Sequence, residues 1–279
     1  MARAALRDLR GAFAKFFADR GTHLAAMIAY FALVSFVPLV FLALSLLGLT
    51  GRADETNYLV RELKKAFPGT SVGDIVHAVR SIQRNAATLG IVGGVFLAWS
   101  SLSLFSVLES AFNIVYGKPN RSFLRGKILA VLIAVGSLVA LFIALVIGSI
   151  GYDVLKRYAP GFIGNGYVAY TVSVLVSMLG VFAFLVAVYY VLTNENINFV
   201  EVLPGAVLAT VVLEASFQVL PVYLRLSGNV LAARALGAPA LLLIWLYVMA
   251  NVIVFGAELN WRQGRRRREL ELDDVPGLA

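Results

Sequence analysis

Residues 202–224 read VLPGAVLATVVLEASFQVLPVYL, a stretch long and apolar enough to cross a lipid bilayer as one helix. A membrane-spanning helix needs about 20 mainly apolar residues to cover a hydrocarbon core of roughly 30 Å. The only charged residue of the stretch is Glu214, about 12 residues into it. At 1.5 Å per residue this is roughly 18 Å along the helix, so Glu214 is expected close to the middle of the membrane.

The rest of the chain has the composition of a membrane protein. Of its 279 residues 60% are hydrophobic and only 14% are charged, whereas about 25% are charged in an ordinary soluble domain. We therefore predict an all-α fold, a single integral membrane domain over residues 1–279 with a bundle of six transmembrane helices. Five other stretches meet the length requirement: 24–49, 89–115, 128–151, 167–192 and 238–261.

Three segments outside these spans have patterns of their own. Residues 1–23 place Leu6, Leu9, Phe13, Phe16 and Phe17 on one helical stripe, which predicts an amphipathic helix. This helix either lies at the membrane surface or packs as a cap on the ends of the bundle, and both alternatives stay open. Residues 50–88 predict an extracytoplasmic hairpin of two helices. Residues 262–279 form a basic and then acidic tail, whose arginines are expected to anchor it at anionic lipid heads.

The distribution of basic residues predicts the orientation. Counted on alternate sides of the six spans, 14 of the 24 Lys and Arg residues lie on the side that holds both termini. Of the 10 on the opposite side, 6 lie in the long segment 50–88, and long segments contribute less to orientation. Both termini are therefore expected in the cytoplasm. The net charge of +8 is explained in this way without a nucleic-acid partner.

Two further glutamates lie within predicted spans, nearer to their ends than Glu214. Ionisable groups inside a membrane are costly and are functional candidates by default. Glu258 has Arg262 at i+4, a favourable spacing for an ion pair on a helix. Glu109 shares a helix face with Asn113, and basic residues follow in the next segment. For Glu258 we expect a structural ion pair or a helix cap, and for Glu109 a structural role with a basic partner from that segment.

Glu214 has no cation within reach on its own helix, and Gln218 at i+4 shares its face. Such an acid suits either a polar substrate path or a hydrogen bond between helices, and both remain open. In the last span Tyr247, Asn251 and Glu258 lie on one continuous face, so Asn251 is the expected neighbour of a site at the middle of the membrane.

Pro38 lies inside the first span and removes one backbone donor, so a kink or break is expected over residues 34–38. Ser35 is placed to satisfy a carbonyl freed there.

The motifs of common enzymes and metal sites are absent from the sequence. There is no cysteine, and the two histidines, His23 and His77, lie in different segments, so no zinc cluster is predicted. The sequence has no P-loop, no dinucleotide-binding glycine motif and no H-E-x-x-H motif. We therefore predict no enzymatic activity, no metal site and no cofactor.

Several stretches resemble the bacterial YihY/virulence factor BrkB family of inner-membrane proteins. They are AYFALVSFVPLV (29–40), ESAFNIVYG (109–117), RSFLRGKI (121–128), LPGAVLATVVLEAS (203–216) and LLLIWLYVMANVIVFGAELN (241–260). The resemblance implies six transmembrane helices in the inner membrane with both ends cytoplasmic. It also covers a set of polar, proline and glycine positions: Tyr30, Ser35, Pro38, Glu109, Asn113, Arg125, Pro204, Gly205, Glu214, Trp245, Tyr247, Gly256, Glu258 and Asn260. One departure is the loop TNENINF (193–199), which lacks the basic residues expected there.

Members of the family carry both an older label as a tRNA-processing ribonuclease and suggestions of lipid or solute export. Our leading hypothesis is a protein that binds or moves a lipid-like or amphipathic substrate between its helices, with membrane lipids as its partners. The candidate residues are Glu214, Gln218, Asn251, Tyr247, Glu109, Asn113, Glu258 and Tyr30. The second hypothesis is a membrane scaffold or envelope-integrity protein that transports nothing, and the third is a tRNA-processing ribonuclease.

Overall fold

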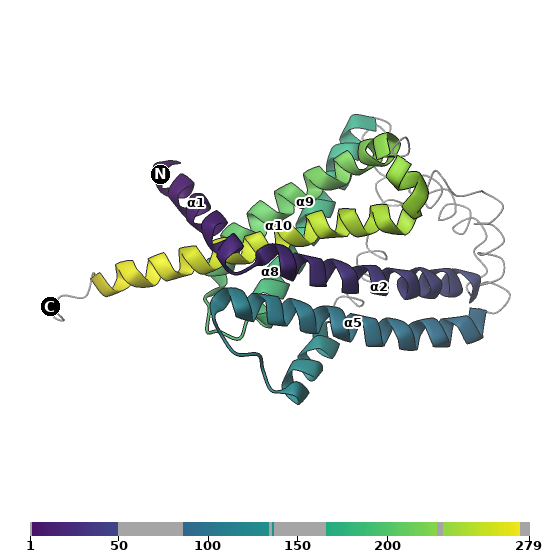
Figure 1. Cartoon of the computed structure of the whole chain (residues 1–279), viewed down its shortest axis with the longest axis horizontal. Coiled ribbons are helices and arrows are strands. Elements are labelled where there is room, and N and C mark those ends of the chain that lie inside the picture. The colour runs from purple at the N-terminus through teal and green to yellow at the C-terminus, as the bar shows by residue number, and fades with distance from the viewer. Residues whose placement is uncertain (1, 50–85, 134–135, 137–165, 228–230, 274–279) are drawn as a thin grey trace, which may run out of the picture. The chain divides into compact units, whose positions relative to one another are not determined.

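The computed structural model describes residues 2–49, 86–133, 136, 166–227 and 231–273. These residues are helical apart from short connections, and no strand occurs among them. Residues 123–133 also form a helical segment. The all-α prediction is thus confirmed for the described part of the chain (Figure 1). Its long helices are α1 (Ala2–Ala18), α2 (Gly21–Leu49), α5 (Ala86–Tyr116), α8 (Gly166–Leu192), α9 (Phe199–Ser227) and α10 (Leu231–Asp273).

Four helices in the described residues are long and apolar enough to cross a membrane. Their apolar parts are Gly94–Tyr116, Val174–Leu192, Phe199–Val219 and Ala240–Glu269. They correspond to four of the six predicted spans. A fifth predicted span, 24–49, is helical throughout as part of α2. Residues 50–85 of the predicted hairpin and most of the predicted span 128–151 fall outside the described residues, so the count of six remains a prediction. Residues 86–88, also assigned to the hairpin, belong to α5.

Helix α2 continues through Pro38 to Leu49. The expected break therefore does not occur, while a kink at Pro38 stays a prediction. The Ser35 hydroxyl donates to the Phe31 carbonyl at 2.8 Å. Pro38 has no N–H, so the carbonyl left without its i+4 donor is that of Val34, three residues after Phe31. Ser35 therefore does not serve the carbonyl that we expected it to serve.

The chain divides into two compact units. The first unit comprises Met1–Gly21, Leu108–Glu214 and Val252–Ala279, and the second comprises Thr22–Val107 and Ala215–Asn251. Helices α5, α9 and α10 each contribute residues to both units. The prediction of one integral domain stays a prediction. The ion pairs discussed below lie in the first unit.

Helices α9 and α10 make a close contact inside the first unit. A Cβ atom on Gly205 would lie 2.0 Å from the carbonyl oxygen of Gly256, so only glycine fits at this position. The Gly205 N–H donates to Asn260 Oδ1 at 2.6 Å, and the Tyr189 hydroxyl on α8 donates to the Ile253 carbonyl at 2.8 Å. Small residues and hydrogen bonds of this kind are what holds helices together in lipid.

Helix α1 packs on α10. The rings of Phe13 and Phe16 lie 6.5 and 6.1 Å from that of Phe255, measured between centroids. Asp8, Ala12 and Phe16 are buried, whereas Phe13 and Phe17 are exposed. The buried face is thus shifted from the predicted stripe, because acid–base pairs with α10 draw Asp8 inward. The contact between α1 and α10 is the one expected if α1 caps the end of the bundle. The exposed rings of Phe13 and Phe17 leave apolar surface on α1.

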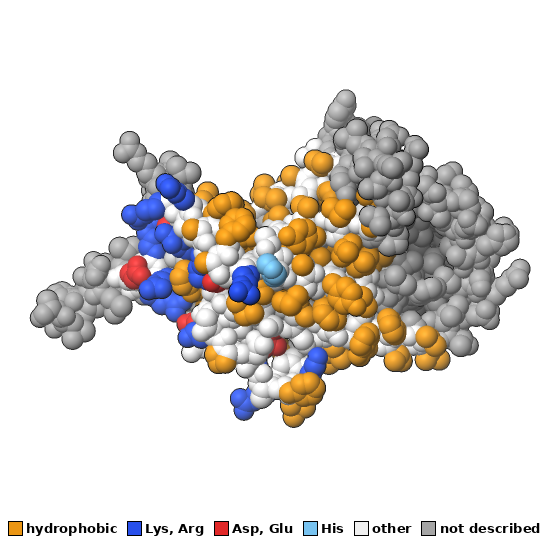
Figure 2. Space-filling view, in the orientation of Figure 1, with side chains coloured by type: hydrophobic (Ala, Val, Ile, Leu, Met, Phe, Trp, Pro, Cys, Tyr) orange, Lys and Arg blue, Asp and Glu red, His pale blue; other side chains and the backbone are white. Residues whose placement is uncertain are grey.

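The surface supports a membrane location for the spans. On α8 the side chains of Leu175, Val176 and Leu179 are 59%, 65% and 67% exposed, which suits contact with lipid. Lys and Arg side chains instead gather over α1 and the C-terminal part of α10 (Figure 2). Helix α10 continues to Asp273, so the segment predicted as a tail is helical up to this residue.

Candidate functional site

Glu258 is completely buried and forms an ion pair with a lysine from α1. The Nζ atom of Lys15 lies 3.0 Å from Glu258 Oε2. Lys15 also donates to the Val115 carbonyl on α5 at 2.7 Å, forms an ion pair with Asp19, and lies 4.3 Å from the centre of the Trp261 ring. One lysine thus connects α1, α5 and α10 around a buried carboxylate.

The predicted structural role of Glu258 agrees with this geometry, but the predicted partner was wrong. Arg262 reaches toward Asp8 on α1, with its Nε atom 3.9 Å from Asp8 Oδ1. Asp8 is buried and also accepts a hydrogen bond from Arg266 at 2.8 Å. Helical spacing identified Arg262 as the nearest cation to Glu258. Because α1 packs on α10, Glu258 pairs instead with Lys15, and Arg262 pairs with Asp8.

Glu109 has the basic partner that was expected from the segment after α5. Arg121 contacts Glu109 Oε1 at 3.2 Å. The same guanidinium donates to three carbonyls at the C-terminal end of α8, those of Val191, Leu192 and Thr193, at 3.2, 2.7 and 2.9 Å. The last carbonyls of a helix have no partner within it and carry partial negative charge. Arg121 therefore caps α8 and ties it to α5.

Asn113 and Glu195 tie the neighbouring loops together. Asn113 accepts a hydrogen bond from the backbone N–H of Asn194 at 2.8 Å and donates to Asn120 at 3.1 Å. Glu195 forms ion pairs with Lys118 and Arg268, both at 3.0 Å. Burial opposes the charged form of Glu195, but the two cations outweigh it and lower the pKa of this carboxyl. The loop that lacks basic residues is thus an acidic partner for cations from elsewhere.

Replacing Arg121 should destabilise the protein strongly. We expect Arg121→Ala to lower the free energy of unfolding by about 3 kcal/mol, since the buried Glu109 carboxylate would lose its cation. Arg121→Lys should recover only part of this loss, because an ammonium lacks the planar fork that reaches several acceptors. Thermal unfolding in detergent would measure both. Arg125→Ala is the matched control, because Arg125 is exposed; an equal loss in the control would contradict the assignment.

Glu214 joins α9 to α8. The Ser177 hydroxyl donates to Glu214 Oε2 at 3.0 Å, and Glu214 is 7% exposed. Gln218, one turn further along α9, is exposed. The sequence did not single out Ser177 as a partner, because a serine on another span has no pattern that relates it to Glu214.

The remaining candidates are placed less centrally. Asn251 donates to the carbonyl of Tyr247 on its own helix at 2.7 Å, so its amide serves α10 itself. Tyr30 on α2 is exposed, and its ring lies edge-on to Phe31 at 5.2 Å between centroids. Among the described residues no group of three or more His, Asp or Glu side chains is placed to hold a metal ion.

These positions can be compared with known proteins. The sequence profile of the family described as virulence factor BrkB matches residues 12–275, nearly the whole chain. The chain belongs to the virulence factor BrkB family. The resemblance seen in the sequence is therefore confirmed.

Relatives of this BrkB-family chain span almost its full length. The ribonuclease-like protein YfkH of Bacillus subtilis is 24% identical over 93% of this chain and 96% of its own. A UPF0761 membrane protein of Vibrio vulnificus is 25% identical over 98% of this chain and 88% of its own. A UPF0761 membrane protein of Rhodospirillum centenum is 27% identical, over 92% of this chain and 58% of its own. No solved structure matches the chain.

Proposed function

We propose that this BrkB-family protein binds or moves a lipid-like or amphipathic substrate between its helices. The observation that carries the proposal is the pair of Glu214 on α9 and Ser177 on α8, joined at 3.0 Å inside two apolar spans. Ser177 is exposed at the surface of α8, and so are the apolar neighbours Leu175, Val176 and Leu179. The polar group of an amphipathic molecule would contact the Glu214–Ser177 pair, and its apolar part would contact these neighbours.

The same proposal places the protein in the inner membrane with both termini in the cytoplasm. The gathering of Lys and Arg over α1 and the C-terminal part of α10 supports this orientation, because basic residues flank spans on the cytoplasmic side. In this orientation a substrate would meet the basic surface at one side of the membrane and the Glu214–Ser177 pair within it.

Transport can be measured in liposomes with labelled phospholipids. We expect Glu214→Leu to reduce lipid flux by about tenfold, equal to 1.4 kcal/mol in the barrier. Ser177→Ala should reduce the flux less, because it leaves the carboxyl group in place. Ser103→Ala is the matched control, since the Ser103 hydroxyl donates to the Trp99 carbonyl of its own helix. Equal flux for the wild type and Glu214→Leu between about pH 5 and 8 would contradict the role given to Glu214.

A membrane scaffold is the second candidate, and the same hydrogen bond favours it, because this bond connects two neighbouring helices. A scaffold predicts no protein-dependent flux. It also predicts that Glu214→Leu costs about 1 kcal/mol of stability, as a hydrogen bond between helices usually contributes in membranes. Measuring flux and thermal unfolding on the same variants separates the two candidates.

The name of YfkH raises a ribonuclease activity as a third possibility. Hydrolysis of RNA assisted by metal ions needs carboxylates or histidines that converge on the metal and on water. The described residues of this chain contain no such group, so the geometry supports a membrane-substrate function better.

A further inference from the structure

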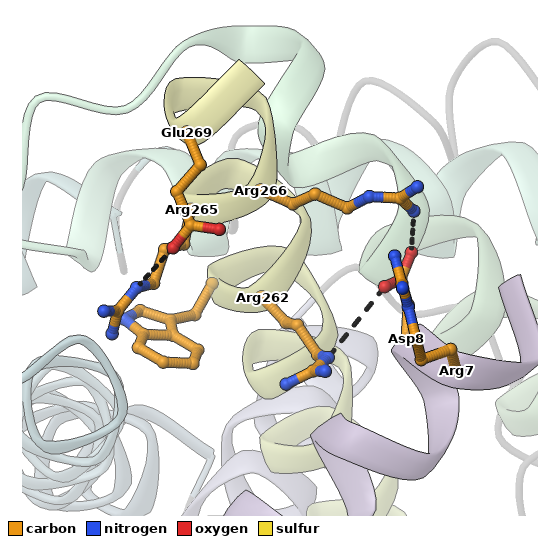
Figure 3. Close-up of a pocket in the computed structure, with 7 residues that line it drawn as sticks. Arg7, Asp8, Arg262, Arg265, Arg266 and Glu269 are labelled. Atoms are coloured by element: carbon orange, nitrogen blue, oxygen red, sulfur yellow. Dashed lines mark hydrogen bonds and ion pairs between the residues drawn. The ribbon is translucent and has the colours of Figure 1, made fainter. Parts of the chain in front are cut away.

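A basic pocket lies between α1 and α10 in the first unit. It is open to the surface, has a volume of about 490 Å³, and is lined by four arginines and two acids, together with Trp261. Cavities of this size suit small-molecule ligands. The charged lining residues are Arg7, Asp8, Arg262, Arg265, Arg266 and Glu269 (Figure 3).

The charges in this pocket do not balance. Glu269 accepts a hydrogen bond from Arg265 at 3.1 Å, and both side chains are more than half exposed. Because Glu269 is paired with Arg265, Asp8 is the one remaining acid in the pocket lining for three arginines, namely Arg7, Arg262 and Arg266. An excess of positive charge therefore remains beside Asp8, in a cavity large enough to admit an anion.

Asp8 holds two of these arginines in place. It is buried, it accepts a hydrogen bond from Arg266 at 2.8 Å, and its other oxygen lies 3.9 Å from Arg262 Nε. Figure 3 shows Arg262 and Arg266 reaching toward Asp8 from two turns of α10, with Arg7 beside Asp8 on α1. Each guanidinium has five N–H donors in a fixed plane. The contacts to Asp8 use few of them, and Arg262 Nε is buried without a hydrogen-bond partner in the described chain.

A glycine on α1 makes room for this arrangement. A Cβ atom on Gly11 would lie 1.9 Å from Arg262 Cζ and 2.3 Å from its Nε atom. Arg262 can therefore lie across α1 only because residue 11 has no side chain. This gives a way to move a guanidinium out of the pocket without changing the charge of the protein.

We propose that this α1–α10 pocket binds the phosphate group of an anionic phospholipid. Guanidinium groups match phosphate oxygens with paired, charge-assisted hydrogen bonds, and several of them on a small anion discriminate against neutral ligands. Arg262, Arg266 and Arg7 provide the donors, and Asp8 orients the first two. Asp8 also limits the net positive charge, which favours a ligand of low charge such as a phosphodiester.

The surroundings of the pocket favour a lipid over a soluble phosphate. The pocket lies at one end of the apolar span Ala240–Glu269, and Trp261, which lines it, is a residue type typical of the membrane interface. On α1 the exposed rings of Phe13 and Phe17, 58% and 54% exposed, are suited to insertion among acyl chains. A bound lipid would thus have its phosphate on the arginines and its chains beside these rings.

This proposal does not depend on transport. A lipid held in the α1–α10 pocket as a fixed partner would give saturable binding in a protein that shows no flux. Conversely, flux that depends on Glu214 would not require this pocket.

The test measures binding of soluble short-chain lipids to the full-length protein in detergent by calorimetry. The probes are dioctanoyl phosphatidylglycerol, dioctanoyl phosphatidylcholine and inorganic phosphate. For the wild type we expect saturable binding of the phosphatidylglycerol, at least tenfold tighter than that of the other two. Tight binding of inorganic phosphate would overturn the lipid assignment, and absence of saturable binding of any probe would overturn the site.

Charge-matched variants distinguish a built site from general attraction to a basic surface. Arg7→Ala and Arg267→Ala each remove one exposed positive charge, but only Arg7 lines the pocket. We expect Arg7→Ala to weaken phosphatidylglycerol binding by about fivefold to tenfold and Arg267→Ala by less than twofold. Equal losses in the two variants would overturn the proposal, because they would show that only net charge matters.

Gly11→Ala tests the geometry at constant charge. It should displace Arg262 and weaken phosphatidylglycerol binding by at least fivefold, while the protein keeps its helical content and elutes as a single species in size-exclusion chromatography. Unchanged binding in Gly11→Ala would show that the position of Arg262 does not matter, and the proposed site would be wrong.

Discussion

Gly205→Ala is expected to cost about 3 kcal/mol or more in the free energy of unfolding. The added Cβ would lie 2.0 Å from the Gly256 carbonyl oxygen and 2.5 Å from Asn260 Oδ1. Overpacking usually costs about 1–3 kcal/mol. Here the nearest atom belongs to the backbone and cannot rotate away, so α9 and α10 must separate. Their separation also breaks the 2.6 Å hydrogen bond from Gly205 to Asn260.

Thermal unfolding in detergent would measure this loss, and Gly180→Ala provides a matched control. Gly180 lies inside α8, and a Cβ placed on it would have no neighbour within 4 Å. Alanine is a better helix former than glycine by about 1 kcal/mol. The control should therefore be neutral or slightly stabilising. Equal melting temperatures for the two variants would refute the close contact between α9 and α10.

Lys15→Met should be the most destabilising change of a charged residue among those considered. It would leave the Glu258 carboxylate, 0% exposed, without the cation that now lies 3.0 Å away. Removing one partner of a buried ion pair typically costs about 3–5 kcal/mol, because the other charge remains buried. Methionine keeps most of the length of the lysine side chain, so the measured loss would report mainly on charge.

A double-mutant cycle shows whether this loss comes from the pair. Glu258→Gln in the Lys15→Met background should restore part of the stability, since it removes the unpaired charge. Arg265→Met is the exposed control: Arg265 and Glu269 form a pair at 3.1 Å with side chains 65% and 63% exposed. Such surface pairs contribute about 0.2–1 kcal/mol. A loss for Lys15→Met no larger than for Arg265→Met would contradict the structural role of Glu258.

The buried charges and the pocket have different consequences for function. Two buried ion pairs, Lys15–Glu258 and Arg121–Glu109, connect helices. Replacing any of these residues should therefore affect function by destabilising the protein. Arg7, in contrast, is exposed, and the neighbouring Asp8 forms its ion pairs with Arg262 and Arg266. Loss of lipid binding in Arg7→Ala without loss of stability would therefore be a functional effect.

Hydropathy alone was enough to predict the class of this protein. A helix in lipid must form all its backbone hydrogen bonds internally and present apolar side chains along the thickness of the bilayer. Its position can therefore be predicted from a run of consecutive apolar residues. Four predicted spans, 89–115, 167–192, 202–224 and 238–261, correspond to apolar helices of the structure. The family was also recognisable from local stretches of sequence, and its profile matches residues 12–275.

The partners of the polar residues were decided by the tertiary structure. Spacing along one helix suggested Arg262 for Glu258, but Lys15 of α1 occupies this place, and Arg262 turns to Asp8. Likewise, the partner of Glu214 is Ser177, 37 residues away in the sequence. The α8 carbonyls that accept from Arg121 are about 70 residues away from it. Helical periodicity relates only residues three or four apart. Contacts between helices depend on which faces pack together, and the sequence of one helix does not contain this information.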